Sequence, residues 1–211
     1  MSRAVIFDVD GVLIHGMHTN PAYVRRWDAG LLADLGVDPQ RFVSEFIYDI
    51  FIKRVVTGQI SIIEALERRL PGLGFQGSPM AFLQYWLEHD SELNQPLLDV
   101  IRRLKASGDV RLYIATNQEH MRAHWLWSHL RLCDLFEDIF YSARIGVRKP
   151  DRRFFKFIES KLGPQDEPPL FFDDTPAVIA GAQAAGWEAV LFDTLSDCTN
   201  HPWIAERIAS S

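Results

Sequence analysis

Two aspartates separated by one residue and followed by glycine are the part of the sequence most suggestive of chemistry. Asp8 and Asp10 directly follow the apolar residues Val5–Phe7, and Gly11 comes next. Carboxylates so close together repel each other, so a cation or a catalytic role would make their proximity tolerable. Mg²⁺ is the simplest candidate, because it prefers oxygen ligands. The alternative is that these residues only form the turn that ends a strand, where Asp and Gly are common.

Later segments also carry polar residues of the kinds that phosphoryl transfer requires. Thr116 and Asn117 offer a hydroxyl and an amide that can donate to phosphate oxygens, and Lys149 offers a positive charge. Asp173 and Asp174 form a second carboxylate pair. Taken singly, Thr116-Asn117 or Asp173-Asp174 would cap a helix and Lys149 would be a solvated surface residue. Their combination favours one shared site.

Predicted strands and helices place these residues along one edge of a sheet. Short apolar runs with β-branched members are typical of strands in a parallel sheet covered on both faces. Strands alternating with helices predict an α/β fold with a doubly wound parallel sheet, whose ligands bind at the carboxyl ends of the strands. The predicted strands are Val5–Phe7, Val110–Ala115, Ile139–Ser142, Pro168–Phe172 and Ala189–Phe192. The predicted helices are Leu97–Ala106, Glu119–Leu130, Phe154–Leu162, Pro176–Ala185 and a short one around Trp203–Ile208.

A block without a convincing strand separates the first predicted strand from the others. Amphipathic spacing, prolines at helix entrances and a capping-box pattern at Ser61 with Glu64 predict four helices. Their ranges are Pro21–Leu35, Pro39–Val56, Ser61–Leu70 and Pro79–His89. Four such segments with short loops form a small helical bundle. We therefore expect an α/β core of residues 1–15 and 92–211 and an inserted helical cap of residues 16–91.

Composition excludes several classes of partner. The chain has 211 residues, of which 47% are hydrophobic, which is enough for one large domain or a domain with an insertion. Its net charge of −6 argues against a nucleic-acid-binding surface. No run approaches the ~18 apolar residues of a membrane span, and no signal peptide is indicated. Cys133 and Cys198 are too few for a disulfide framework, so we expect a cytoplasmic monomer or homodimer with a small-molecule partner.

The four polar segments together resemble the haloacid dehalogenase (HAD) superfamily, and the resemblance covers essentially the whole chain. The helical insertion is similar to the bundle-type cap of one subgroup, and the resemblance implies a Rossmann-like core. The matching motifs, in order, are Phe-Asp8-Val-Asp10-Gly11-Val, Ala-Thr116-Asn117, Lys149-Pro150-Asp151 and Phe-Phe-Asp173-Asp174.

The resemblance assigns roles to the motif residues. Asp8 is expected to attack phosphorus and form an aspartyl-phosphate, and Asp10 to act first as general acid and then as general base. Lys149 would stabilise the nucleophile and the developing charge. The expected Mg²⁺ ligands are Asp8, the backbone carbonyl of Asp10, Asp174 and, directly or through water, Asp173. The expected substrate contacts are Gly11, Thr116, Asn117 and Arg148.

The predicted function is Mg²⁺-dependent hydrolysis of a small phosphorylated metabolite, with two alternatives. Dehalogenation is disfavoured by Asp10, because a halide leaves without protonation. A sugar-phosphate mutase of the same superfamily remains open, although the histidine that such mutases tend to carry four residues before a cap tryptophan corresponds to Tyr23 before Trp27. The third possibility is a non-catalytic member that binds a phosphorylated ligand or a protein.

Overall fold

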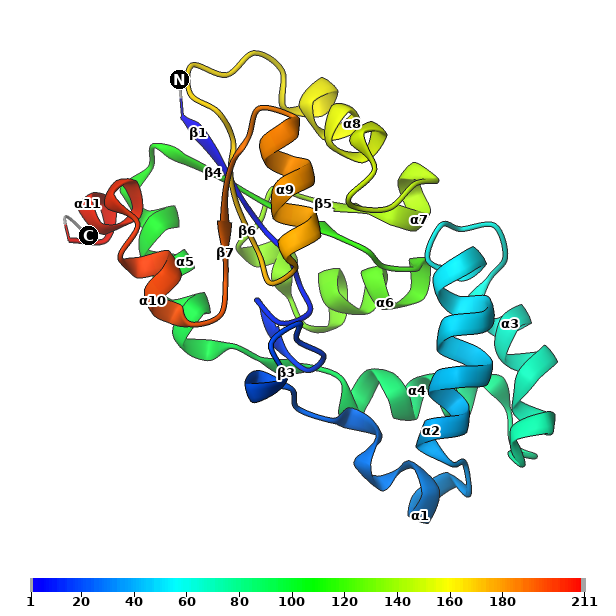
Figure 1. Cartoon of the computed structure of the whole chain (residues 1–211). Coiled ribbons are helices and arrows are strands. Elements are labelled where there is room, and N and C mark those ends of the chain that lie inside the picture. The colour runs from blue at the N-terminus through cyan, green and yellow to red at the C-terminus, as the bar shows by residue number, and fades with distance from the viewer. Residues whose placement is uncertain (1, 210–211) are drawn as a thin grey trace.

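A five-stranded parallel sheet lies at the centre of the chain, in the order β5-β4-β1-β6-β7 (Figure 1). The computed structural model describes residues 2–209. The strands are β1 (Arg3–Phe7), β4 (Val110–Thr116), β5 (Asp138–Tyr141), β6 (Leu170–Asp173) and β7 (Glu188–Leu191). Strand β1 is central and pairs in parallel with β4 on one side and β6 on the other. The predicted α/β fold class is confirmed.

Alternate residues of β1 face two separate hydrophobic clusters, as the pleat of a strand requires. Val5 and Phe7 pack in one cluster with side chains from α5 (Gln95–Ser107), α6 (His120–His124) and α11 (Pro202–Ala209). Ala4 and Ile6 pack in the other with side chains from α8 (Arg152–Leu162) and α9 (Pro176–Ala184). Helices therefore cover both faces of the sheet, and the sheet is doubly wound.

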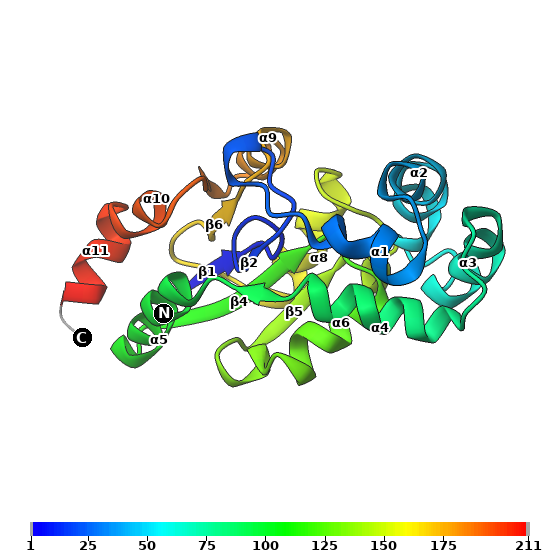
Figure 2. The same cartoon turned by 90° about the horizontal axis from the view of Figure 1, so that it is seen from below.

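The helices inserted after β1 gather at one end of the molecule, away from both termini (Figures 1 and 2). They share a hydrophobic cluster of their own, which includes Leu31, Phe42, Phe46, Leu66 and Trp86. We call residues 16–91 the cap, and its boundaries remain the prediction made above. Its elements are η1 (Pro21–Tyr23), η2 (Trp27–Gly30), α1 (Leu31–Leu35), α2 (Pro39–Phe42), η3 (Val43–Val55), α3 (Ile62–Arg69), η4 (Leu70–Leu73) and α4 (Pro79–His89).

The predicted helix Pro21–Leu35 is wrong as a single helix. The chain forms two short 3₁₀ turns and then α1, because Val24 and Arg26 have extended backbone with ψ of 125° and 107°. The backbone N–H of Arg25 donates to the carbonyl of Gly16 at 2.8 Å instead of to a helical partner. The predicted helix at Pro39–Val56 is present, but its part η3 has wider, π-type winding.

Two short strands join the cap to the core. β2 (Ile14–His15) and β3 (Glu92–Leu93) pair antiparallel where the chain enters and leaves the cap. Asn94 fixes this junction, because its side-chain amide donates to the carbonyl of Val12 at 2.9 Å and its backbone N–H donates to the carbonyl of Leu13 at 2.9 Å. The turn after Asp10 is thereby tied to the exit of the cap.

Two further features bear on the compositional predictions. Cys133 and Cys198 are both free thiols, as expected. Among residues 2–209, no helix has the length and apolar character needed to cross a membrane.

The remaining helical segments complete the core. They are η5 (Trp125–His129), η6 (Leu132–Asp134), α7 (Ser142–Ile145) and α10 (Leu195–Thr199). The predicted helix Glu119–Leu130 corresponds to α6 continued by η5, which again has π-type winding. Helix α10, which the sequence analysis did not predict, begins with a capping box formed by Thr194 and Asp197.

Candidate active site

A buried lysine joins two of the predicted carboxylates. Asp8 follows β1, Asp173 is the last residue of β6, and Lys149 lies in the loop before α8. The Nζ of Lys149 lies 2.9 Å from Asp8 Oδ1 and donates to Asp173 Oδ2 at 2.6 Å and to the carbonyl of Ala115 at 2.8 Å. The ammonium group thus makes two hydrogen bonds, and an ion pair with Asp8. Lys149 is only 3% exposed, so its charge is fixed beside Asp8.

Burial and the neighbouring charges shift the pKa values of Asp8 and Lys149. Burial raises the pKa of Asp8 well above its usual value, against the lowering effect of Lys149. Burial disfavours the charged form of Lys149, but the negative charges of Asp173 and Asp8 outweigh it and raise the lysine pKa. The lysine therefore stays cationic, and a second cation beside Asp8 would favour the ionised carboxylate further.

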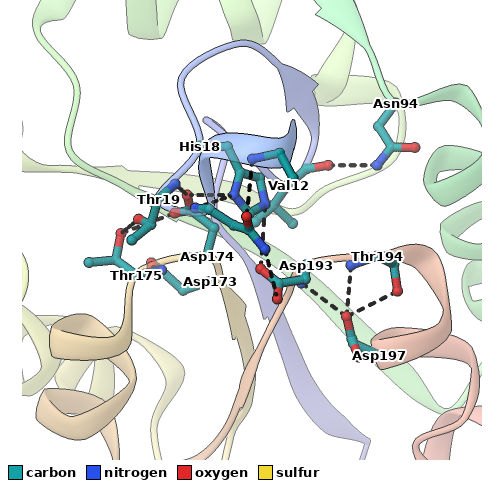
Figure 3. A network of polar contacts seen from close by, with 12 residues as sticks. Val12, His18, Thr19, Asn94, Asp173, Asp174, Thr175, Asp193, Thr194 and Asp197 are labelled. Carbon is teal, nitrogen blue, oxygen red and sulfur yellow. Dashed lines mark hydrogen bonds and ion pairs between the residues drawn. The ribbon is translucent and has the colours of Figure 1, made fainter. Parts of the chain in front are cut away.

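Asp174 is held by residues that follow β2 as well as by its own loop (Figure 3). Its Oδ2 accepts a hydrogen bond from the backbone N–H of Thr19 at 2.6 Å, and its Oδ1 accepts one from the hydroxyl of Thr175 at 3.0 Å. His18 lies beside it, with Nδ1 3.7 Å from Asp174 Oδ2. Burial raises the pKa of Asp174, partly offset by the Thr19 N–H. His18 lies in the loop that leads into the cap and was not among the site residues predicted from the sequence.

The three carboxylates fit a divalent metal ion. Asp8, Asp173 and Asp174 each offer an oxygen, and these oxygens lie within 4.8 Å of one another. Mg²⁺ takes carboxylate and water oxygens in a compact octahedral shell, so clustered, buried carboxylates suit it. Asp10 does not contribute its side chain to this cluster, and the predicted role of its backbone carbonyl stays a prediction.

Gly11 lies close to the Asp174 side chain of this cluster. Its φ is +77°, a left-handed conformation that favours glycine, and an added Cβ would lie 2.7 Å from Asp174 Oδ2. Its N–H donates to the carbonyl of Ile14 at 3.0 Å. The observed role of Gly11 is therefore to let the chain turn closely past Asp174, and a substrate contact through its N–H would require this hydrogen bond to break.

The side chain of Asp10 points to a different set of partners, none of which the sequence analysis identified. Arg122 binds it through two hydrogen bonds, from Nη1 to Oδ2 at 2.9 Å and from Nη2 to Oδ1 at 2.7 Å. Gln118 donates to Oδ2 at 2.6 Å. Arg122 also contacts Asp90, at 3.1 Å from Oδ2 and 3.2 Å from the backbone carbonyl. Gln118 lies in the loop before α6 and Arg122 lies within the helix, so no helical spacing in the sequence indicated that they share a partner.

Asp90 and Arg122 are both almost fully buried. Burial raises the pKa of Asp90 to about 6, although Arg122 lowers it. Burial acts against the charge of Arg122, but Asp10 and Asp90 more than compensate and raise the arginine pKa. This trio is thus a second charged network, distinct from the one around Lys149, and it reaches from Asp10 to the end of α4.

The other predicted substrate contacts differ in burial and in hydrogen bonding. Thr116 is the last residue of β4 and is 1% exposed. Asn117 braces the Lys149 loop, because its Oδ1 accepts from the Lys149 N–H at 2.8 Å and its Nδ2 donates to the Lys149 carbonyl at 3.2 Å. One amide N–H of Asn117 is left for a substrate. Arg148 is exposed and does not line the cavity beside Asp10.

A cavity of about 310 Å³ lies between the cap and the core and is bounded by Asp10, Asn117, Gln118 and Arg122 on the core side. Cap residues such as Trp27, Phe51 and Trp86 form the opposite wall. The candidate nucleophile and the cavity are therefore linked through Asp10, two residues after Asp8.

Comparison with known proteins assigns the class. A family model described as haloacid dehalogenase-like hydrolase matches residues 2–186, and the chain belongs to this family. The fold is similar to that of a HAD family enzyme from Bacteroides thetaiotaomicron solved with magnesium and inorganic phosphate. The TM-score is 0.70 at 19% identity, over 90% of this chain and 94% of that one. At this identity the likeness shows the fold.

Two curated relatives have higher sequence identity within the aligned region. A phosphoglycolate phosphatase from Rhodospirillum rubrum is 27% identical over an alignment of 203 positions, which covers 90% of this chain and 79% of the relative. A sesquiterpene phosphatase from Aspergillus oryzae is 33% identical over 103 residues, which is 48% of this chain. The match spans only about half of that relative, 52% of its length.

Proposed function

We propose that the protein is a Mg²⁺-dependent phosphomonoesterase that acts on a small phosphorylated metabolite through an aspartyl-phosphate on Asp8. The observation that carries this proposal is the cluster of Asp8, Lys149, Asp173 and Asp174 at the carboxyl ends of the central strands. Membership of the hydrolase family and the phosphatase names of two relatives support it.

The proposed reaction has two steps. An oxygen of the Asp8 carboxylate attacks phosphorus, the bond to the alcohol oxygen breaks, and Asp10 protonates that oxygen as it leaves. Water then attacks the phosphorus of the aspartyl-phosphate, Asp10 takes the proton from the water, and inorganic phosphate leaves with Asp8 restored. Arg122 and Gln118 orient the Asp10 carboxylate, which lines the cavity where the alcohol would lie.

The positive groups have separate tasks. Lys149 holds Asp8 at 2.9 Å and balances negative charge on the phosphoryl oxygens. Mg²⁺, held by Asp8, Asp173 and Asp174, would neutralise further charge on the phosphoryl group. Thr116, the last residue of β4, is proposed to orient the phosphate.

The test is phosphate release from a panel of phosphomonoesters by the purified protein with Mg²⁺. Asp8→Asn should lower kcat by about 10⁴-fold or more, because the nucleophile is lost. Asp99→Asn is the matched control, since this aspartate is 71% exposed and pairs only at the surface with Arg102. Chelation should abolish turnover, and added Mg²⁺ should restore it. An active Asp8→Asn variant, or no release from any ester, would refute the proposal.

Product analysis separates hydrolysis from the mutase alternative. With a hexose 1-phosphate, hydrolysis yields free hexose and inorganic phosphate, whereas a mutase yields the 6-phosphate. We expect free phosphate from any hexose 1-phosphate that reacts. Accumulation of the 6-phosphate without phosphate release would assign the mutase function instead.

A further inference from the structure

Most of the residues that the cap contributes to the cavity beside Asp10 are apolar, and its charged residues there are Arg26, Asp28 and Asp90. Trp27, Ile47 and Phe51 line the cavity and are each partly exposed. Trp86 stacks on Trp27 with ring centroids 5.1 Å apart and contacts Phe51 at 5.3 Å. Flat aromatic faces and branched aliphatic side chains bind hydrocarbon well, because they bury large apolar areas at little cost in side-chain entropy.

The charged side chains of the cavity are already paired with one another. Within the described residues, the basic groups that line it are Arg26 and Arg122, and the acidic groups are Asp10, Asp28 and Asp90. Arg26 binds Asp28 through hydrogen bonds of 2.8 and 2.9 Å, and Arg122 binds Asp10 and Asp90. Acidic groups outnumber basic ones by three to two. A second anionic group on the substrate would therefore be repelled.

The amides of the cavity are largely engaged, although one N–H of Asn117 is left for a substrate. Gln118 donates to Asp10 at 2.6 Å, and Asn117 exchanges two hydrogen bonds with the backbone of Lys149. The indole N–H of Trp86 donates to Asp90 at 3.2 Å. The hydroxyls of a sugar would lose water in this cavity and recover few hydrogen bonds, which costs binding free energy.

We propose that the preferred substrate is a phosphomonoester of an apolar alcohol. Its hydrocarbon part lies against Trp27, Phe51 and Trp86, and its ester oxygen lies next to Asp10. This inference rests on the proposed phosphomonoesterase function and specifies its substrate class. It excludes, as good substrates, esters whose alcohol carries a carboxylate, a second phosphate or several hydroxyls.

The first experiment needs only the wild-type protein. It compares kcat/KM for butyl, hexyl and octyl phosphate, whose primary alcohols are nearly equal as leaving groups, with 2-phosphoglycolate and glucose 6-phosphate. Each methylene buried in an apolar site favours binding about fourfold. We expect kcat/KM to rise about 16-fold from butyl to hexyl phosphate and to exceed both polar esters.

A cation placed in the wall provides the second experiment. Ile47→Lys should lower kcat/KM for hexyl phosphate by about 10-fold or more and raise it for 2-phosphoglycolate, because the new ammonium group offers a partner for the carboxylate. Leu32→Lys is the matched control: Leu32 is 57% exposed in α1 and does not line the cavity, so neither value should change. Thermal melts of both variants show whether they are folded.

The outcomes separate this inference from the function on which it rests. If none of the five esters releases phosphate, the phosphomonoesterase function itself fails. If 2-phosphoglycolate or glucose 6-phosphate exceeds hexyl phosphate in kcat/KM, or chain length has no effect, the enzyme is a phosphatase and the apolar substrate class is overturned. An unchanged preference in a folded Ile47→Lys variant would also overturn it.

Discussion

Replacing Arg122 by Met removes a buried cation while keeping most of the side-chain volume. Arg122 is 8% exposed as a side chain and binds two carboxylates, of which Asp10 is 32% exposed and Asp90 is 7% exposed. Water reaches Asp10 and compensates part of its loss, whereas Asp90 keeps only the Trp86 N–H at 3.2 Å. Breaking a buried pair from one side typically costs 3–5 kcal/mol, so we expect Arg122→Met to lower the free energy of unfolding by about 3 kcal/mol at pH 8.

The loss of unfolding free energy in Arg122→Met should increase with pH. Arg122 lowers the pKa of Asp90, which burial raises to about 6. Without the arginine this pKa rises further, so Asp90 stays protonated to higher pH in the variant than in the wild type. The stability gap therefore widens as pH rises above about 6, by about 1.4 kcal/mol for each unit by which the pKa has moved.

Urea unfolding followed by circular dichroism at pH 5.5 and pH 8 measures the unfolding free energy lost in Arg122→Met and its change with pH. Arg102→Met is the control, because this guanidinium is 50% exposed and pairs with Asp99 at the surface, where a pair is worth at most about 1 kcal/mol. Equal losses in the two variants, or a gap for Arg122→Met that does not change with pH, would show that Arg122 does not stabilise these carboxylates.

Three further perturbations have outcomes fixed by the same geometry. In Gly11→Ala, an alanine must adopt a φ of +77° and its Cβ would lie 2.7 Å from Asp174 Oδ2. The variant should therefore lose about 1–3 kcal/mol of unfolding free energy and need more Mg²⁺ for half-maximal activity, which a metal titration measures. Lys149→Met leaves two buried carboxylates without their cation. The rate constant in single-turnover assays should fall by about 10²–10³-fold, whereas it would fall far less if the lysine were only structural. Asp90→Asn removes a carboxyl group whose pKa is raised from 3.8 to about 6 in the folded state. In the wild type this group contributes stability below pH 3.8, and the contribution is lost as the pH rises through about 6. The stability of this variant relative to the wild type should increase by about 2 kcal/mol between pH 4 and pH 7 in urea unfolding, and a constant difference would contradict it.

The sheet could be predicted because its signals are local. Strands β1, β4 and β6 are short, largely apolar runs whose side chains are mostly buried, and Asp8, Thr116 and Asp173 stand at their carboxyl ends. The failure at Pro21–Leu35 has a long-range cause, since the Arg25 N–H bonds to Gly16 outside the segment. Periodicity within a window cannot report a partner that lies elsewhere in the chain. The two-residue strands β2 and β3 are too short to show any period.

The site residues also fall into those that the sequence predicts and those that only the fold reveals. Asp8, Lys149, Asp173 and Asp174 occur in motifs that can be recognised in the sequence, and the fold brings them together. Arg122 lies on a helix and looks like any other basic residue in an amphipathic segment. Its role depends on Asp90, which lies 32 residues earlier at the exit from the cap. Only the three-dimensional arrangement shows that these two residues meet beside Asp10.

The Arg122 network gives the cap a direct connection to the proposed acid. Arg122 donates to the backbone carbonyl of Asp90, just after α4, where a cation also interacts favourably with the helix dipole. The same guanidinium holds both oxygens of Asp10, and only a planar, forked group can make these contacts together. Trp86, which lines the cavity, donates to the Asp90 side chain. A substrate that packs against Trp86 therefore touches a chain of contacts that ends at Asp10, so the apolar wall and the position of the acid are coupled through Asp90 and Arg122.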